Sequence, residues 1–286
     1  MNRNEPYRVE PIDSWDEYSE KVATLCNGWA FRGHADSTWQ LMSTLGRYLN
    51  TYIKEEYWTE QEQRNLRIFQ RKAHLFLTNI PEQSDTFQWL ALMQHHGAPT
   101  RLLDFTWSPY VAAFFALERT AKQAAVWAVN PKKLVNVTER LNEFLENSLA
   151  GILGIGEPFV MNTRLIAQSG TFIVTKQLGA PIEDIVSAYD DPEDTLVKFE
   201  LPAQLVRPSG MRALFMMNIT NATLFPDLDG LARSLAYELE FHWAHDPRKV
   251  LETKEAQEEE KRAGKGLDLN IREMGSEREI GPDLKV

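Results

Sequence analysis

Residues 111–117 are apolar at every position, and this run constrains the fold more than any other feature of the chain. Ser108 and Pro109 precede it, and a hydroxyl residue followed by proline is typical of the N-cap and first position of a helix. A helix that is apolar on all sides has no face suited to water. The sequence therefore predicts a buried helix inside a core of ordinary size for 286 residues.

Strand-like runs and amphipathic helices alternate irregularly around this helix. Period-two or short apolar runs indicate strands, whereas apolar residues at steps of three and four indicate helices. We expect strands at 29–33, 100–106, 124–129 and 196–201, the last half-buried, and a strand pair or kinked strand at 165–174. Helices are expected from Ser14, over 55–80, 86–96 and 131–149, and from about Pro208 and Pro226. The mixture predicts an α+β fold with a small mixed or antiparallel sheet core surrounded by several helices.

Composition narrows the class of protein. Hydrophobic residues make up 43% and charged residues 25%, a balance typical of a packed globule. The single cysteine, Cys26, excludes an internal disulfide and a multi-thiolate metal site, and favours a reducing compartment. No stretch approaches 18 uncharged apolar residues, so we expect a cytoplasmic protein without membrane contact.

Charge and organisation along the chain add three expectations. The net charge of −10 argues against broad binding to phosphate backbones, although it is compatible with a local basic groove. Residues 1–245 show no internal boundary and are expected to form one domain. Residues 246–286 are rich in charge and poor in periodicity, which predicts a charged C-terminal tail, partly disordered or helical.

Four ordered motifs resemble those of the FRG domain. They are FRGHADSTWQL at 31–41, QHHGAPTRLLD at 94–104 with the following Thr-x-Ser-Pro, RLIAQSGTF at 164–172 and LFPDLDG at 224–230. The resemblance covers roughly residues 14–240. FRG domains are best known as domains of unassigned activity in bacteria and their phages, often near defence or toxin genes. The resemblance therefore implies such a setting, and the chemistry has to come from the site.

Arg32 is the first candidate site residue. With Gly33 it is expected at the end of a strand, where its planar fork of donors suits a phosphate or pyrophosphate. The alternative is a structural ion pair with a carboxylate such as Asp104.

His95 and His96 are expected at a helix C-terminus. Neighbouring helical side chains diverge by about 100°, so only one of them can face a given site. That histidine can carry a proton at neutral pH, or it can cap the helix dipole. No third Cys or His ligand lies nearby in sequence, so no metal site is predicted.

The segment after the histidines carries further candidates. Arg101 and Asp104 lie three apart on an extended segment and hence on opposite faces. Asp104 is suited to orient a histidine or hold Arg32, and Arg101 to fix the loop or bind an anion. Thr106 and Ser108 are expected to direct hydroxyls at a pocket, with Ser108 as a plain helix N-cap the alternative.

The order of these residues is similar to that in ADP-ribosyltransferases. In that family an arginine or histidine on the first strand holds NAD, a hydroxyl step supports the nicotinamide ribose, and a late-strand glutamate stabilises the transition state. Here Arg32, Thr106 or Ser108, and Gln168 correspond. An amide cannot offset developing positive charge, so catalysis would need another carboxylate, with Glu157 and Glu200 as candidates.

Three hypotheses follow. The first is an NAD-using, ADP-ribosyltransferase-like enzyme, acting as a bacterial or phage toxin or defence effector on a protein or nucleic acid. In it Arg32, His95, His96, Thr106 and Gln168 are catalytic, and Arg32, Gly33, Arg101, Asp104 and Ser108 bind NAD. The second is a non-catalytic module that binds a nucleotide or nucleic-acid phosphate in the same pocket. The third is an interaction module whose polar cluster only stabilises the fold, with the acidic tail recruiting a partner.

Overall fold

The computed structural model describes residues 5–25, 28–120, 122–137, 140–146 and 151–241. Cys26 and the predicted tail at 246–286 lie outside the described residues. The chain divides into two units, residues 1–233 and 234–286, and the sheet and the candidate site belong to the first. None of the described helices combines the length and the apolar character that crossing a bilayer requires.

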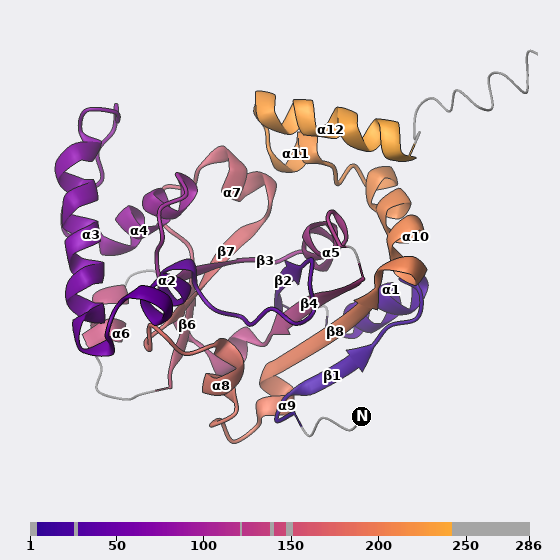
Figure 1. Ribbon diagram of the computed structural model, residues 1–286, viewed down its shortest axis with the longest axis horizontal. Helices are drawn as coiled ribbons and strands as arrows, with labels where there is room; N and C mark the ends of the chain where they lie inside the picture. Colours follow the sequence, from indigo (N-terminus) through magenta and orange to yellow (C-terminus); the bar gives the residue numbers. More distant parts are fainter. Residues whose placement is uncertain (1–4, 26–27, 121, 138–139, 147–150, 242–286) are drawn as a thin grey trace, which may run out of the picture. The chain divides into compact units, whose positions relative to one another are not determined.

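The described residues build an eight-stranded sheet in the order β1-β8-β4-β2-β3-β7-β6-β5 (Figure 1). Two neighbouring pairs, β1 with β8 and β5 with β6, are parallel, and the other neighbours are antiparallel. The sheet is therefore mixed, as predicted, but larger than the small core expected. The strands are β1 (Arg8–Pro11), β2 (Ala30–His34), β3 (Leu102–Thr106), β4 (Gln123–Val129), β5 (Val135–Asn136), β6 (Leu153–Gly156), β7 (Gly170–Thr175) and β8 (Leu196–Pro202).

The sheet opens in its middle, between β2 and β3. These strands share one residue pair, Phe31 with Thr106, whereas β2 pairs with β4 over five residues and β3 with β7 over five. Backbone groups beyond that pair therefore have no ladder partner across the opening and must find other ones.

The apolar helix is present as α5 (Pro109–Leu117) and confirms the prediction. Ser108 is its N-cap, because the Ser108 side chain accepts a hydrogen bond from the Val111 amide. The helix packs directly on β2 at Gly33, where an added Cβ would lie 2.0 Å from the Ala112 carbonyl oxygen and 2.6 Å from the Ala116 nitrogen. Glycine at this position is what lets α5 approach the strand so closely.

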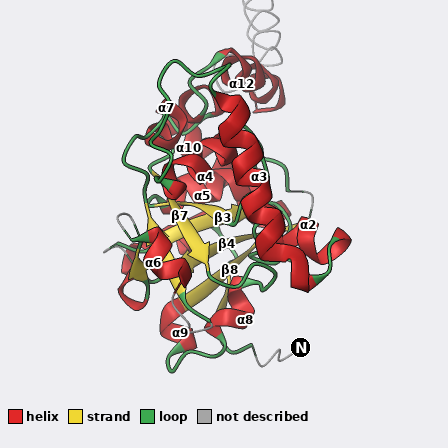
Figure 2. Ribbon diagram, turned by 90° about the vertical axis from the view of Figure 1, so that its left-hand side faces the viewer, coloured by secondary structure: helices red, strands yellow, loops and turns green. Residues whose placement is uncertain are grey.

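Helices cover both faces of the sheet, with α4 and α5 on one side and α8 and α9 on the other (Figure 2). Ala30 and Leu103 belong to the core cluster that includes α8, whereas Leu102 and Phe172 belong to the one that includes α4. Because side chains alternate along a strand, Arg32 starts from the α8 face and Asp104 from the α4 face.

Several expected elements are confirmed and the remaining helices complete the fold. Ser14 caps α1, whose Glu17 amide donates to the Ser14 hydroxyl. The bounds are α1 (Trp15–Thr24), α2 (Thr44–Tyr52), the 3₁₀ helix η1 (Glu55–Tyr57), α3 (Trp58–Ala73), α4 (Thr86–His95), the 3₁₀ helix η2 (Pro131–Lys133), α6 (Leu141–Glu146), α7 (Thr163–Ala167), α8 (Ile182–Val186), α9 (Pro192–Thr195), α10 (Ala203–Met216), α11 (Asn221–Leu224) and α12 (Leu228–Phe241).

Three predictions are wrong in ways that matter for the site. Arg32 lies in the middle of β2 rather than at its end. The expected strand pair at 165–174 is helix α7 followed by β7, with Ser169 at a φ of 47° reversing the chain between them. Gln168 therefore caps a helix and is not on a late strand.

Other departures have simple local causes. Residues 131–149 do not form one helix, because Asn130 caps the short turn η2 and the chain then adds β5 to the sheet. Strand β8 is buried along most of its length rather than half-buried, since it is an interior strand on which helices α9 and α10 pack. Helix α10 begins at Ala203, so Pro208 lies inside it.

Candidate functional site

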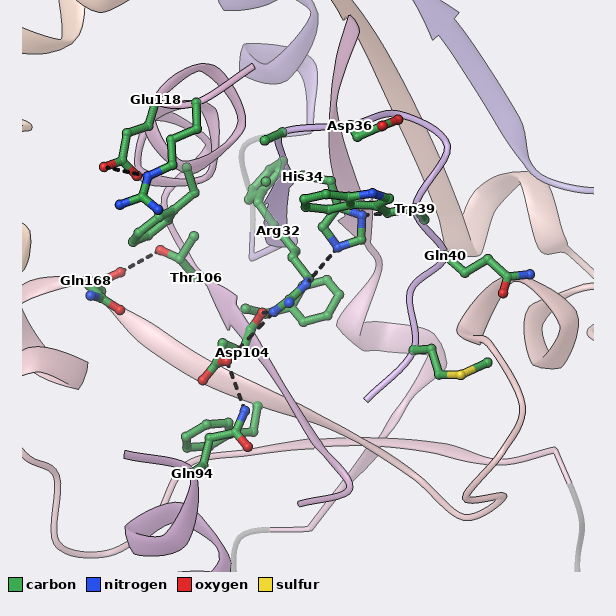
Figure 3. A pocket seen from close by; sticks show the side chains of 18 of the residues that line it. Arg32, His34, Asp36, Trp39, Gln40, Gln94, Asp104, Thr106, Glu118 and Gln168 are labelled. Carbon is green, nitrogen blue, oxygen red and sulfur yellow. Dashed lines mark hydrogen bonds and ion pairs between the residues drawn. The ribbon is translucent and has the colours of Figure 1, made fainter. Parts of the chain in front are cut away.

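A cavity of about 1430 Å³ lies where β2 and β3 separate (Figure 3). Its walls come from β2 and the loop that follows it, from β3, from the ends of α4 and α5, and from α7. Most of the predicted site residues meet here: the cavity is lined by Arg32, Gly33, His95, Asp104, Thr106 and Gln168, and the described lining does not include His96, Arg101 or Ser108.

Arg32 bridges the opening in the sheet. Its Nη1 donates to the carbonyl oxygen of Asp104 at 2.6 Å, so the guanidinium supplies a donor to a backbone group beyond the single β2–β3 pair. The same nitrogen lies 3.9 Å from the Asp104 carboxylate, and the side chain is 24% exposed. Burial lowers the pKa of Arg32 and the Asp104 charge opposes it, but a guanidinium stays protonated in either case.

His34, which the sequence analysis missed, holds Arg32 from the other side. Its Nε2 accepts from Arg32 Nε at 3.0 Å, so its Nδ1 carries the proton and faces the Trp39 carbonyl oxygen at 3.3 Å. Burial, with the Arg32 charge second, lowers the pKa of His34 to about 3. The imidazole is therefore neutral at physiological pH and links the arginine to the loop after β2.

That loop presents Trp39 to the cavity. Asp36 shapes it by accepting hydrogen bonds from the Thr38 amide at 2.8 Å and the Thr38 hydroxyl at 2.7 Å. The Ser37 amide donates to the Gln123 carbonyl oxygen, which fastens the loop to β4. The Trp39 side chain is nevertheless 56% exposed and packs edge to face on His34. A large aromatic surface is thus held open beside Arg32.

The side chains of Thr106, Ser108 and Gln168 form hydrogen bonds with backbone groups. Thr106 Oγ1 donates to the Gln168 carbonyl oxygen at 2.7 Å and accepts from the Ser108 amide at 3.0 Å. Gln168 Nε2 donates to the Leu224 carbonyl oxygen at 3.0 Å. Ser108 is the N-cap of α5, which is the alternative considered from the sequence. These groups tie α5, α7 and α11 to β3.

His95 and His96 are neighbours at the C-terminal end of α4 but line different cavities. His95 is the last residue of α4 and lines the cavity, where burial, followed by the charges of His96 and Arg164, lowers its pKa. His96 is exposed and lines a separate apolar groove beside α3. The two rings touch edge to face, with centroids 4.9 Å apart.

Arg101 and Asp104 point to different places, as the strand pattern predicted. Arg101 is 6% exposed, forms an ion pair with Glu62, and donates to the carbonyl oxygen of Thr175 at 3.2 Å. It fastens α3 to the sheet, which corrects the expectation that it binds a cofactor in the pocket. Asp104 faces the cavity with a side chain that is 58% exposed, and its carboxylate accepts from Gln94 Nε2 at 3.0 Å.

The two carboxylates proposed to replace a catalytic glutamate lie elsewhere. Glu157 accepts from Trp107 Nε1 at 2.6 Å, and Glu200 forms an ion pair with Lys198 at 2.9 Å. Neither belongs to the described lining of the cavity. The carboxylates that do line it are Asp36, Asp104 and Glu118.

The lining is locally basic although the chain is acidic. Six cationic side chains line the cavity, against the three carboxylates: Arg32, Arg47, Arg119, Lys122, Arg164 and Arg233. The chain as a whole carries a net charge of −10. A concavity with this excess of positive charge attracts anions even when the whole protein repels them.

No group of three or more His, Cys, Asp or Glu residues placed to hold a metal ion occurs among the described residues. The family model of the FRG domain matches residues 27–125, about one third of the chain. The match includes β2, α4, β3 and α5, and hence both sides of the opening in the sheet. Neither a search of curated proteins nor a search of solved structures gave a match.

Proposed function

We propose that this domain, whose residues 27–125 match the family model of the FRG domain, binds a nucleotide carrying a pyrophosphate, such as NAD, in the cavity between β2 and β3. The observation that carries the proposal is a basic cavity in an acidic chain, with Arg32 and an exposed indole side by side in its wall.

Arg32 and Arg47 are assigned to the phosphates. Arg32 Nη1 and Nε already have partners, which fix the guanidinium and leave its remaining donors for an anion. Arg47 is held by the Met42 carbonyl oxygen at 2.7 Å and the Thr44 hydroxyl at 3.0 Å, and its charge lowers the pKa of Arg32. Two pre-positioned cations that repel each other are stabilised when an anion binds between them.

Trp39 is assigned to a base. An exposed indole next to fixed cations offers a stacking surface to any nucleobase, whatever its hydrogen-bonding pattern. A ligand with an aromatic base at one end and phosphates at the other therefore matches the wall from Trp39 to Arg32. Inorganic pyrophosphate would use only half of this surface.

A second candidate function is cleavage of NAD, and the exposed carboxylate of Asp104 favours it. Breaking the bond between nicotinamide and ribose leaves the electron pair on nicotinamide and positive charge on the ribose. In this proposal the carboxylate of Asp104, whose side chain is 58% exposed in the cavity, offsets that charge, which the amide of Gln168 cannot do. Water, or a hydroxyl of a protein or nucleic acid, would form the new bond to the ribose and release its proton.

This second candidate corresponds to an ADP-ribosyltransferase or an NAD glycohydrolase. In the bacterial and phage setting implied by the FRG resemblance, such an enzyme would act as a toxin or a defence effector. The two candidates share the cavity and differ in turnover alone, so binding and product release have to be measured separately.

Binding is tested by calorimetric titration of the full chain with NAD, ADP-ribose, ADP and adenosine. We expect affinity for the three charged ligands and much weaker binding of adenosine, and we expect Arg32→Gln to weaken binding. Arg67→Gln on the exposed side of α3 is the matched control, because it removes the same charge outside the cavity. Equal binding of adenosine and ADP-ribose would contradict the phosphate assignment.

Cleavage is tested by following nicotinamide released from NAD. Asp104→Asn should abolish release while leaving ADP-ribose affinity within a few-fold, and the control Asp190→Asn, an exposed residue outside the cavity, should leave both unchanged. NAD that binds without releasing nicotinamide would refute cleavage and retain the binding module.

A further inference from the structure

One part of the cavity wall holds two guanidiniums near one buried ring. The guanidinium carbon of Arg164 lies 4.3 Å from the centroid of Phe225, and that of Arg233 lies 5.6 Å from it. Phe225 is 7% exposed and packs edge to face on Phe115. Arg164, Arg233 and both phenylalanines line the cavity, so the two guanidiniums form part of its wall.

Neither arginine has a carboxylate partner at ion-pair distance among the described residues. Burial lowers the pKa of Arg164, the charges of Asp104 and Asp227 partly oppose this, and the charge of Arg233 adds to it. Arg101, by contrast, forms an ion pair with Glu62 and donates hydrogen bonds to backbone carbonyl oxygens. Arg164 is thus a half-buried cation that gains most from an external anion.

This group comes from other elements than the group around Arg32: Arg164 lies on α7 and Arg233 on α12, whereas Arg32 lies on β2. Asp104 raises the pKa of both Arg32 and Arg164, so its carboxylate lies within electrostatic reach of both. Pockets for a single small ligand usually measure about 300–1000 Å³. At about 1430 Å³ the cavity has room for a second ligand beside the proposed nucleotide.

We propose that the part of the wall formed by Arg164, Phe225 and Arg233 binds a short segment of single-stranded nucleic acid as a second ligand. A guanidinium over an aromatic ring, as Arg164 lies over Phe225, can offer its outer side to a base and its remaining donors to a phosphate, a pairing that single-stranded nucleic acids provide. The net charge of −10 restricts contact to a few nucleotides, because a longer backbone would be repelled. The inference rests on the proposed function in placing the nucleotide beside Arg32.

The test measures fluorescence anisotropy of a labelled six-nucleotide single strand, as DNA and as RNA, over a range of salt concentrations. The double variant Arg164→Gln, Arg233→Gln should bind at least tenfold more weakly than the unchanged chain. Losing one or two phosphate contacts should also reduce the slope of log K against log salt by about 0.7–1.4. Arg67→Gln is the control for charge, and melting temperatures check that each variant folds.

Two further measurements separate this inference from the proposed function. ADP-ribose affinity should be unchanged in the double variant, and saturating ADP-ribose should leave the affinity for the strand unchanged within about twofold. Competition between the two ligands would show a single site and overturn the inference. The inference is also overturned if ADP-ribose binds and the strand does not, or if an acidic peptide binds through Arg164 in its place. If neither ligand binds, the proposed function fails as well.

Discussion

Replacing Arg32 with glutamine tests two roles of this side chain: its hydrogen bonds across the opening between β2 and β3, and its proposed contact with phosphate. The variant removes the hydrogen bonds that Arg32 donates to the Asp104 carbonyl oxygen at 2.6 Å and to His34 Nε2 at 3.0 Å. Leaving each of the two acceptors unpaired costs about 1–3 kcal/mol, and water reaching a side chain that is 24% exposed recovers roughly half of the combined cost. We expect a net loss of about 1–3 kcal/mol in the free energy of unfolding.

The effect on ligand binding should be larger in relative terms. A charge-assisted hydrogen bond to phosphate contributes about 1.5–3 kcal/mol, which corresponds to a dissociation constant raised about 10- to 150-fold. The melting temperature should fall by about 2–12 °C, because 1 kcal/mol shifts it by about 2–4 °C in domains of 150–250 residues. Calorimetric titration with ADP-ribose and differential scanning calorimetry give the two numbers.

The two numbers together decide the role of Arg32. A lower melting temperature with unchanged ADP-ribose affinity would show that Arg32 only closes the opening in the sheet, and the nucleotide assignment would be wrong. Arg67→Gln should change neither quantity by a comparable amount, since that residue is exposed on α3.

Three further predictions concern the framework of the site. Gly33→Ala places a Cβ 2.0 Å from the Ala112 carbonyl oxygen, so the free energy of unfolding should fall by at least about 3 kcal/mol, or the variant should fail to fold. An unchanged denaturant midpoint would contradict the close contact between Gly33 and α5. Glu62→Gln leaves Arg101 buried and unpaired, so it should cost about 3–5 kcal/mol in the free energy of unfolding while ADP-ribose affinity stays the same; a loss of affinity would mean that Arg101 acts on the cavity after all. His34 stays neutral in the folded protein down to about pH 3 but takes up a proton near pH 6.5 when unfolded. Its contribution to the free energy of unfolding is therefore complete above pH 6.5 and falls by at most about 5 kcal/mol as the pH is lowered to 3. His34→Gln should flatten the pH dependence of the melting temperature between pH 6.5 and 3, and an unchanged slope would exclude His34 as its source.

Local signals predicted the local structure. Ser14 and Ser108 cap helices where the sequence indicated, and the apolar run at 111–117 is the buried helix α5. Each of these features depends on residues within one or two turns of each other, so a single sequence is enough to identify it. The meeting of Arg32 with Asp104 and Thr106 was also predicted, through motifs whose residues line one cavity.

The pairing of strands could not be predicted in the same way. The opening between β2 and β3 depends on which distant segments pair, and no local pattern encodes a ladder of one residue pair. For the same reason Arg32 was expected at a strand end and Gln168 on a strand. The shape of the cavity, and thus its basic charge, follows from this pairing.

Residues within one motif also take different roles that sequence does not separate. Arg101 and Asp104 belong to the same segment, yet one is buried against Glu62 and the other faces the cavity. His34 follows Phe31-Arg32-Gly33 directly and was overlooked, although it fixes the arginine that defines the site. Its position two residues after Arg32 on one strand face was the available signal.

The central claim is that the opening between β2 and β3 is a nucleotide site, and a crystal structure of the full chain with ADP-ribose tests it most directly. We predict the pyrophosphate within hydrogen-bond distance of the Arg32 guanidinium and the adenine stacked on Trp39. A ligand bound elsewhere, with Arg32 contacting only Asp104 and His34, would contradict the claim.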